Sequence, residues 1–162
     1  MITIRRAKPE DAEGIHRAHM QSIQKLCTKE YTPEQIEAWG NRPYDAERYL
    51  GGIQNDFVWV IETNGSIEGY CEVSIIQSDG EVYANLCGLY LTPKVKNKKL
   101  GLALIQAAEK QCWLISVKTI KLHSTLTSLG FYEKMGFQKT AERFEREIRG
   151  VVIQSVPMEK RL

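Results

Sequence analysis

Two tight-turn signals in the middle of the chain constrain the fold most strongly. Asn64-Gly65 is the strongest two-residue hairpin signal, and Ser78-Asp79-Gly80 turns the chain a second time. The stretches on either side of these turns, 57–61, 67–76 and 81–91, alternate in polarity or are continuously apolar, as strands are. The sequence therefore predicts a three-stranded antiparallel meander.

Helical patterns precede the meander. Thr32 can cap a helix, Pro33 takes its first position, and Gln35 completes a capping pattern. Apolar residues recur at helical spacing after Pro9-Glu10-Asp11, whose acidic side chains suit the positive end of a helix. The elements expected before the meander are a strand over 2–7, a helix from Pro9 to about Cys27, a helix from Thr32 to Gly40, and a short helix over 45–50 that ends at Gly51-Gly52.

Strands and helices alternate after the meander. The elements expected there are a long helix over 100–116, a short strand over 119–123, a helix over 125–135 ended by Gly136, and strands over 137–145 and 151–158. Strands first and alternation afterwards indicate the α+β class. We expect one domain over residues 1–162, with a central mixed and mostly antiparallel sheet of about seven strands, flanked by four or five helices.

Charge and cysteine usage exclude several classes of protein. The chain has 22 Lys plus Arg against 20 Asp plus Glu, so nucleic acid and a membrane surface are not expected partners. No apolar run approaches the roughly 20 residues of a membrane span, and the chain opens without an export leader, so we expect a cytoplasmic protein. No metal is expected, because the cysteines lack clustered spacing and are expected to be buried thiols: Cys27, Cys71, Cys87 and Cys112.

The segment most informative about function joins the last strand of the meander to the long helix. Four lysines fall within six residues of that loop, at positions 94, 96, 98 and 99. The start of a helix offers free N–H groups and a positive dipole end, so lysines there suit a ligand with several phosphates. On composition alone, a solvated surface loop is the simpler interpretation.

This segment resembles the cofactor loop of the GNAT superfamily of acyl-CoA-dependent N-acetyltransferases. Members end their fourth strand in a pattern like L-Y-V-x-P and continue with Q/R-x-x-G-x-G/A. Residues 89–93 (Leu-Tyr-Leu-Thr-Pro) match the first part, and Gly101 matches the final glycine, whereas Lys96 replaces Gln or Arg and Lys99 replaces the first glycine. The resemblance implies acetyl-CoA as cosubstrate, bound by Leu89, Tyr90, Leu91, Lys96, Asn97, Lys98, Lys99, Leu100, Gly101, Leu102 and Thr127.

A second segment carries the same resemblance. Phe131-Tyr132-Glu133-Lys134, followed by Gly136-Phe137, is similar to the F-Y-E-K-x-G-F run of the family, and Thr127 stands where Asn is frequent. The resemblance implies that Tyr132 is the general acid that protonates the departing thiolate. A phenol of pKa about 10 can deliver a proton to a thiol of pKa about 8.5 as charge develops. The structural alternative is an aromatic residue that packs under the sheet.

The acceptor side is less constrained by the sequence. Glu72 and Glu81 are candidate bases, but solvated strand-edge charges are the simpler interpretation of both. His16 and His19 lie on the first helix, where a histidine is more often structural. Cys87 lies on the last strand of the meander, where buried cysteines are usually inert. No residue is therefore assigned as the general base.

The resemblance implies an N-acetyltransferase in which a primary amine attacks the thioester directly. A backbone N–H near Leu91 would polarise the thioester carbonyl, and the acceptor would be a small-molecule or peptide amine. Dimers are frequent in the family, so a homodimer is a further expectation. The alternative function is a non-catalytic acyl-CoA-binding or regulatory module on the same fold.

Overall fold

The two turn signals form the predicted hairpins in the computed structural model, which describes residues 1–162. β2 (Phe57–Thr63), β3 (Ser66–Ser78) and β4 (Glu81–Leu91) make the antiparallel meander. Asn64 and Asp79 adopt left-handed φ values of 50° and 52°, each followed by a glycine that is also left-handed. These are the positive φ angles that a two-residue hairpin loop requires.

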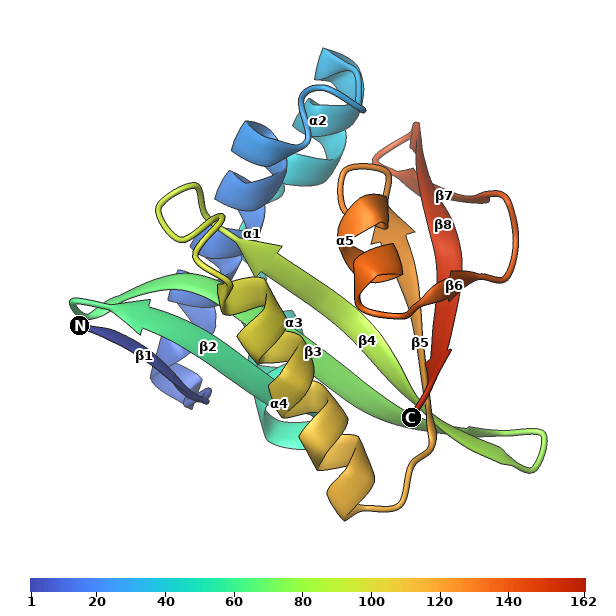
Figure 1. Cartoon of the computed structure of the whole chain (residues 1–162). Coiled ribbons are helices and arrows are strands. Elements are labelled where there is room, and N and C mark those ends of the chain that lie inside the picture. The colour runs from blue at the N-terminus through green and yellow to red at the C-terminus, as the bar shows by residue number, and fades with distance from the viewer.

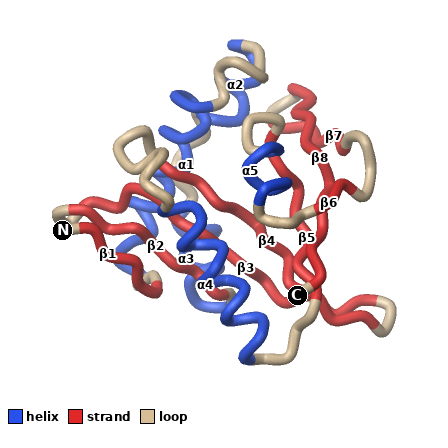
Figure 2. Tube along the Cα trace, viewed as in Figure 1, coloured by secondary structure: helices blue, strands red, loops and turns tan.

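The meander is part of one eight-stranded sheet with the order β1-β2-β3-β4-β5-β8-β6, in which β7 also pairs with β8 (Figures 1 and 2). Only the β4–β5 pair is parallel. The α+β class and the mixed, mostly antiparallel sheet are confirmed. The remaining elements are β1 (Ile2–Arg6), the 3₁₀ turn η1 (Pro9–Asp11), α1 (Ala12–Leu26), α2 (Pro33–Gly40), α3 (Ala46–Asn55), α4 (Leu100–Leu114), β5 (Thr119–Thr125), α5 (Leu129–Lys134), β6 (Gln138–Lys139), β7 (Phe144–Ile148) and β8 (Val151–Arg161).

Helices cover both faces of the sheet. α4 and α5 lie on one face, and α1, α2 and α3 lie on the other (Figure 1). Alternate residues of β3 serve the two cores: Tyr70 packs with α1, whereas Cys71 and Val73 pack with α4. Because side chains alternate across a strand, one central strand can be buried on both faces.

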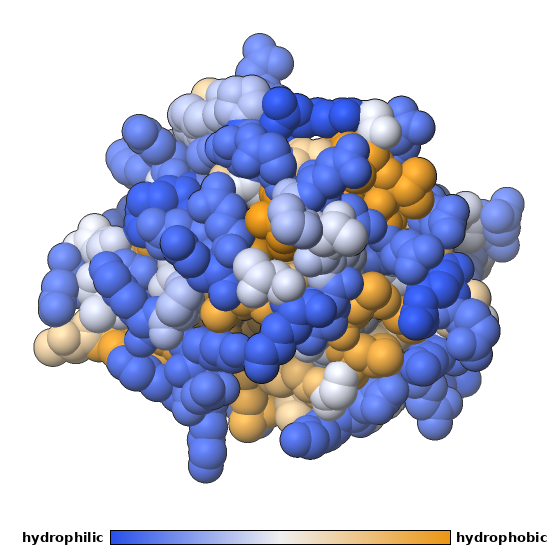
Figure 3. Space-filling view, turned by 90° about the horizontal axis from the view of Figure 1, so that it is seen from above, coloured by the Kyte–Doolittle hydropathy of each residue, from blue (hydrophilic) through white to orange (hydrophobic).

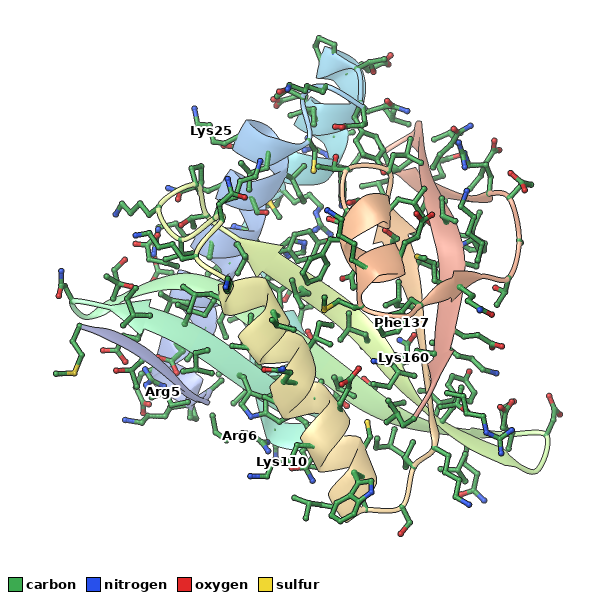
Figure 4. The ribbon with its side chains drawn as sticks, viewed as in Figure 1. Arg5, Arg6, Lys25, Lys110, Phe137 and Lys160 are labelled. Atoms are coloured by element: carbon green, nitrogen blue, oxygen red, sulfur yellow. The ribbon has the colours of Figure 1, made fainter.

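The predicted capping pattern of the second helix is confirmed. The backbone N–H of Gln35 donates to Thr32 Oγ1 at 3.2 Å, and the backbone N–H of Thr32 donates to Gln35 Oε1 at 2.9 Å. At the edge of the sheet, Arg5 of β1 donates to Asp11 and Glu62, which fixes the first strand to the turn that follows it (Figure 4).

Several predicted boundaries are wrong. β8 continues to Arg161 rather than ending at Met158, and α4 ends at Leu114 rather than Ser116. α3 does not end at Gly51-Gly52 but continues to Asn55, because Gly52 is a point of close approach. A Cβ at Gly52 would lie 2.7 Å from Glu72 Oε1. The strand predicted to end at residue 123 continues to Thr125, so the following helix starts only at Leu129.

The strand predicted over 137–145 is interrupted. It forms two short strands, β6 and β7, which both pair with β8. Between them, residues 140–143 stand opposite residues 156–157. The Thr140 N–H still donates to the Pro157 carbonyl at 3.0 Å, and residues 141–143 loop out of the ladder. One of those two opposite residues is Pro157, which has no N–H to contribute to a ladder on either side.

Candidate functional site

The sheet opens where β4 and β5 diverge. The two strands pair only at Ala84–Leu86 against Ile120–Leu122. Beyond this point β4 continues to Leu91. β5 remains paired with β8 and diverges from β4 (Figure 1). Separation of two parallel neighbours leaves strand edges and side chains available to a ligand in the middle of the sheet.

A cavity of about 470 Å³ lies at the end of β4 beside this opening. Every cofactor-binding residue that the sequence predicts lines it, except Lys98. The face seen from above in Figure 3 is hollowed near its middle, where hydrophobic residues show between hydrophilic ones. The lining residues, which come from α1, β4, the lysine loop, the start of α4 and the β5–α5 segment, are Ser22, Leu26, Cys27, Leu89, Tyr90, Leu91, Lys96, Asn97, Lys99, Leu100, Gly101, Leu102, Thr125, Thr127, Ser128 and Phe131.

The lysine loop (residues 94–99) brings positive charge and free N–H groups to this cavity. The first intrahelical bond of α4 is donated by Ala103 to the Lys99 carbonyl, so the N–H groups of residues 100–102 have no partner within the helix. Lys99 takes a left-handed φ of 58° directly before the helix, and Asn97 has a φ of 65°. Lys99 therefore adopts a left-handed conformation that glycine accepts without a side-chain penalty.

A buried carboxylate fixes the beginning of the lysine loop. Glu68 is 1% exposed and accepts hydrogen bonds from Thr92 Oγ1 at 2.6 Å, Ser66 Oγ at 2.8 Å and Lys94 Nζ at 3.1 Å. Burial alone would raise the pKa of Glu68, but these donors outweigh it and the pKa lies below its ordinary value. Lys94 is thus engaged with Glu68, and sequence reasoning missed the role of Glu68 because the partners are distant in the chain.

Thr127 reaches the cavity from the segment between β5 and α5. Its hydroxyl donates to Glu30 Oε2 at 2.9 Å, so this side chain also ties the wall of the cavity to the segment after α1. Lys98, in contrast, does not line the cavity. The prediction that placed Lys98 with the other loop residues has no support in this geometry, because its exposed side chain belongs to the outer surface of the loop.

Tyr132 lies at the narrow centre of the opening. The side chain is 5% exposed and packs edge-on against Phe131 and Phe137. It also borders a space of about 20 Å³ lined by Cys87, Gly88, Leu89 and Tyr90 of β4 and by His123 and Thr125 of β5, among others. The hydroxyl makes no hydrogen bond within the chain, and burial raises its pKa well above the ordinary value. Tyr132 is therefore a core residue that also borders the gap.

The backbone of β4 is irregular beside Tyr132. Leu86 pairs with Val73 and Gly88 pairs with Glu72, so Cys87 has no partner and forms a β-bulge. Its thiol lies 3.0 Å from Ser74 Oγ, and burial raises the pKa of Cys87, which disfavours a thiolate nucleophile. Cys87 is exposed rather than buried as predicted, whereas the other three cysteines are buried and all four are free.

Backbone donors on β4 point into the opening. The Thr92 N–H donates to the Glu68 carbonyl at 2.8 Å. Because amides alternate in direction along an antiparallel strand, the N–H groups of Leu91 and Leu89 point away from β3 and toward the gap. They are available to an acceptor oxygen in the gap.

A second cavity, of about 370 Å³, lies on the other side of the opening. Its walls come from α2 and the segment before it, from β4 and β5, and from β7 and β8: Tyr31, Trp39, Asn85, Leu86, Cys87, Tyr90, His123, Thr125, Phe144, Arg146, Ile153, Gln154 and Ser155. Tyr90 and Thr125 line this cavity, the first cavity and the small space beside Tyr132. The three spaces therefore adjoin in series through the gap in the sheet.

The candidate bases lie apart from the opening or are held by neighbours. Glu81 is at the far end of β4, paired with Lys121 at 2.9 Å. Glu72 is partly buried against Gly52; burial raises its pKa, Asp56 adds to the rise, and Arg48 opposes it.

The two histidines of α1 share one partner. The Nδ1 atoms of His16 and His19 each lie 3.1 Å from the Tyr49 hydroxyl. Burial lowers the pKa of His19, and His19 Nε2 has no hydrogen-bond partner. The His19 ring centroid lies 4.1 Å from that of Tyr90, which connects this pair to the wall of the cavities.

A metal site requires clustered side-chain ligands, and a helix that spans a membrane must be long and apolar. The structure contains no group of three or more His, Cys, Asp or Glu side chains arranged to hold a metal ion. None of its helices has the length and apolar character needed to cross a membrane.

A family model described as "Acetyltransferase (GNAT) domain" matches residues 27–162. A spermidine N(1)-acetyltransferase from Thermoplasma acidophilum is 27% identical, over 85% of this chain and 88% of that protein. The crystal structure of PaiA N-acetyltransferase from T. acidophilum in complex with coenzyme A gives a TM-score of 0.78 at 26% identity, covering 100% of this chain and 99% of that one. A GCN5-related N-acetyltransferase from Rhodopseudomonas palustris gives a TM-score of 0.85 at 22% identity, covering 99% and 95%.

Proposed function

The chain belongs to the GNAT family of acetyltransferases, and from that premise we propose that it transfers the acetyl group of acetyl-CoA to a primary amine by direct attack. The observation that carries the proposal is the series of spaces through the gap between β4 and β5. One end suits a polyphosphate cosubstrate and the other is open to an acceptor. The two reactants would meet at Tyr132.

The residues of the first cavity fit coenzyme A in chemistry. The N–H groups of residues 100–102 and the exposed side chains of Lys96 and Lys99 would hold the pyrophosphate. Apolar side chains from β4 and α5, including Leu89 and Phe131, would line the path of the pantetheine arm. A solved GNAT neighbour described with coenzyme A supports this assignment. Acetyl-CoA, when bound, supplies the activated acetyl thioester.

Backbone donors would stabilise charge at the thioester carbonyl. The N–H groups of Leu89 and Leu91 point into the gap, and such donors are most effective in a site that excludes water. The buried surroundings of Tyr132 would provide that exclusion. Removal of one such donor typically costs about 10²- to 10³-fold in kcat.

Tyr132 would protonate the thiolate of the leaving coenzyme A. Its hydroxyl is free of other partners, and its raised pKa keeps it protonated before the reaction. The phenol can therefore act as a donor without first breaking an internal hydrogen bond. Tyr132 borders the small space that shares Tyr90 and Thr125 with both larger cavities, which supports this role.

The proposal is tested by combining acetyl-CoA with a panel of primary amines, measuring thiol release and identifying the acetylated product by mass spectrometry. We expect saturable acetyl-CoA binding by calorimetry and amine-dependent release of coenzyme A. Binding without transfer to any amine would favour the non-catalytic acyl-CoA module. Absence of binding at millimolar acetyl-CoA and low salt would exclude both functions.

A further inference from the structure

The second cavity is lined by a single charged side chain, which is basic. Arg146 of β7 is that residue, and the remaining lining side chains are neutral and include the aromatic rings of Tyr31, Trp39 and Phe144. No carboxylate lines the cavity. Its charge is therefore opposite to what a polyamine, with several ammonium groups, requires.

Two further arginines lie on the side of the sheet that α1, α2 and α3 cover, and one of them contacts a residue of the cavity wall. Arg42 follows α2, and its Nε donates to the carbonyl of Trp39 at 2.9 Å, next to the cavity wall. Arg48 of α3 stacks over Tyr49, with its Cζ 5.0 Å from the ring centroid. Neither these two nor Arg146 takes part in an ion pair with a carboxylate. Three guanidinium groups thus remain available on one face of the sheet.

The positive charges of the three arginines all lower the pKa of the same histidine, His19. After burial, which is the main cause, the charges of Arg42, Arg48 and Arg146 contribute to the lowered pKa of His19. Arg146 and Arg42 likewise oppose the rise in the pKa of Tyr90, which burial raises to about 12. Since Tyr90 lines both cavities, the positive field extends to the place where an amine would meet the thioester.

The nearest acidic groups lie outside the cavity and do not line it. Glu145 is held by Gln154, whose Nε2 donates to it at 3.1 Å. Glu30 accepts from Thr127 at the first cavity. Glu72 lies on the side of Arg48 and offsets part of the charge of that arginine, although burial raises the pKa of Glu72.

We propose that the acceptor is a primary amine with an anionic group, a carboxylate or a phosphate, at its far end, held by Arg146. This inference rests on the proposed function and specifies its substrate class. Guanidinium groups bind such anions through paired hydrogen bonds, whereas a second ammonium group would be repelled. The substrate would therefore differ in charge from the polyamine in the name of the T. acidophilum relative.

The test uses acceptors of matched length on the full chain at saturating acetyl-CoA. Pentylamine, 1,5-diaminopentane and 5-aminopentanoate differ only in the group remote from the reacting amine, and 4-aminobutyl phosphate replaces the carboxylate by a phosphate. We expect kcat/KM for at least one anionic amine to exceed that for pentylamine by about tenfold, with 1,5-diaminopentane the poorest. Equal or faster turnover of 1,5-diaminopentane would overturn the proposal.

A pair of variants tests whether Arg146 causes the preference for anionic amines. Arg146→Gln should reduce the ratio of kcat/KM for the anionic amine to that for pentylamine by about tenfold. Arg143→Gln removes the same charge from a nearby exposed residue that does not line the cavity and bonds only the carbonyl of Glu142, so the ratio should remain. An unchanged ratio in Arg146→Gln would contradict the assignment.

Binding separates this inference from the proposed function. The chain saturated with coenzyme A has no acetyl group to transfer, so calorimetry with the same amines measures the charge preference alone. Tighter binding of the anionic amines without turnover of any amine would contradict the transferase while supporting the anion site. Equal or tighter binding of 1,5-diaminopentane would overturn the anion site, whatever the activity.

Discussion

Thr92 is joined to Glu68 twice: its N–H donates to the Glu68 carbonyl at 2.8 Å, and its hydroxyl donates to Glu68 Oε2 at 2.6 Å. The first bond extends the pairing of β3 and β4 by one residue, and the second secures the point where the chain leaves the sheet. Lys94 adds a third link to the same carboxylate. The beginning of the lysine loop is therefore fixed to β3 while its later residues face the cavity.

Replacing Glu68 by Gln should lower the free energy of unfolding by about 2–3 kcal/mol. The substitution removes a buried anionic acceptor of three hydrogen bonds, and bonds to charged groups contribute about 1.5–3 kcal/mol each at most. Urea unfolding at neutral pH measures the change. Glu81→Gln is a matched control, because that exposed pair with Lys121 should contribute less than about 1 kcal/mol.

The contribution of Glu68 should depend on pH in one direction. Its pKa is lowered in the folded state, so the stabilisation is complete above the unfolded value of about 4.3 and is lost as pH falls through the folded pKa. The difference in unfolding free energy between the native chain and Glu68→Gln should therefore shrink below about pH 4. A difference that grows on acidification would contradict this assignment.

Lys99→Gly should leave acetyl-CoA affinity within several-fold and raise the free energy of unfolding by up to about 1 kcal/mol. Glycine adopts the left-handed φ of 58° without the steric cost that a side chain adds. This gain is larger than the extra conformational entropy that glycine loses on folding. Lys98→Gly, whose φ is not positive and whose side chain lies outside the cavity, should instead lose about 0.5–1 kcal/mol. A tenfold gain in affinity for Lys99→Gly would show that the lysine obstructs the cosubstrate.

Acetyl-CoA should raise the melting temperature, and its affinity should fall with salt. Binding to the folded state stabilises it by mass action, and the charge of the exposed Lys96 is screened as the Debye length shortens from about 10 Å at 0.1 M to 3 Å at 1 M. Lys96→Gln should flatten the salt dependence measured by calorimetry. Lys110→Gln, toward the other end of α4 (Figure 4), should not. Affinity that is flat with salt would assign binding to backbone amides alone.

Tyr132→Phe should reduce kcat by about 10²- to 10⁴-fold, the usual contribution of a positioned acid or base. Acetyl-CoA affinity and melting temperature should change little, because the ring remains and the hydroxyl has no internal partner to lose. Tyr83→Phe removes a hydroxyl from β4 outside all three cavities and should leave kcat unchanged. Normal turnover of Tyr132→Phe would make Tyr132 a packing residue only.

The sequence by itself determined the features that depend on neighbouring residues. The Asn64-Gly65 turn, the Thr32 and Gln35 capping box and the meander follow from local backbone preferences, so they could be predicted. The motif from Leu89 to Gly101 likewise belongs to one strand–loop–helix segment. Its residues therefore line one cavity, with Lys98 as the exception.

The tertiary structure decided the features that join distant segments. Local pattern assigns Gly52 to a helix end, but the carboxylate of Glu72 requires a glycine there. Glu68 keeps its charge although it is buried, because Thr92 and Lys94 donate hydrogen bonds to it from the segment that follows β4. The second cavity joins residues more than a hundred positions apart, such as Trp39 and Arg146. Its charge could not be predicted from the sequence, because the proximity of side chains there depends on how β4 and β5 separate.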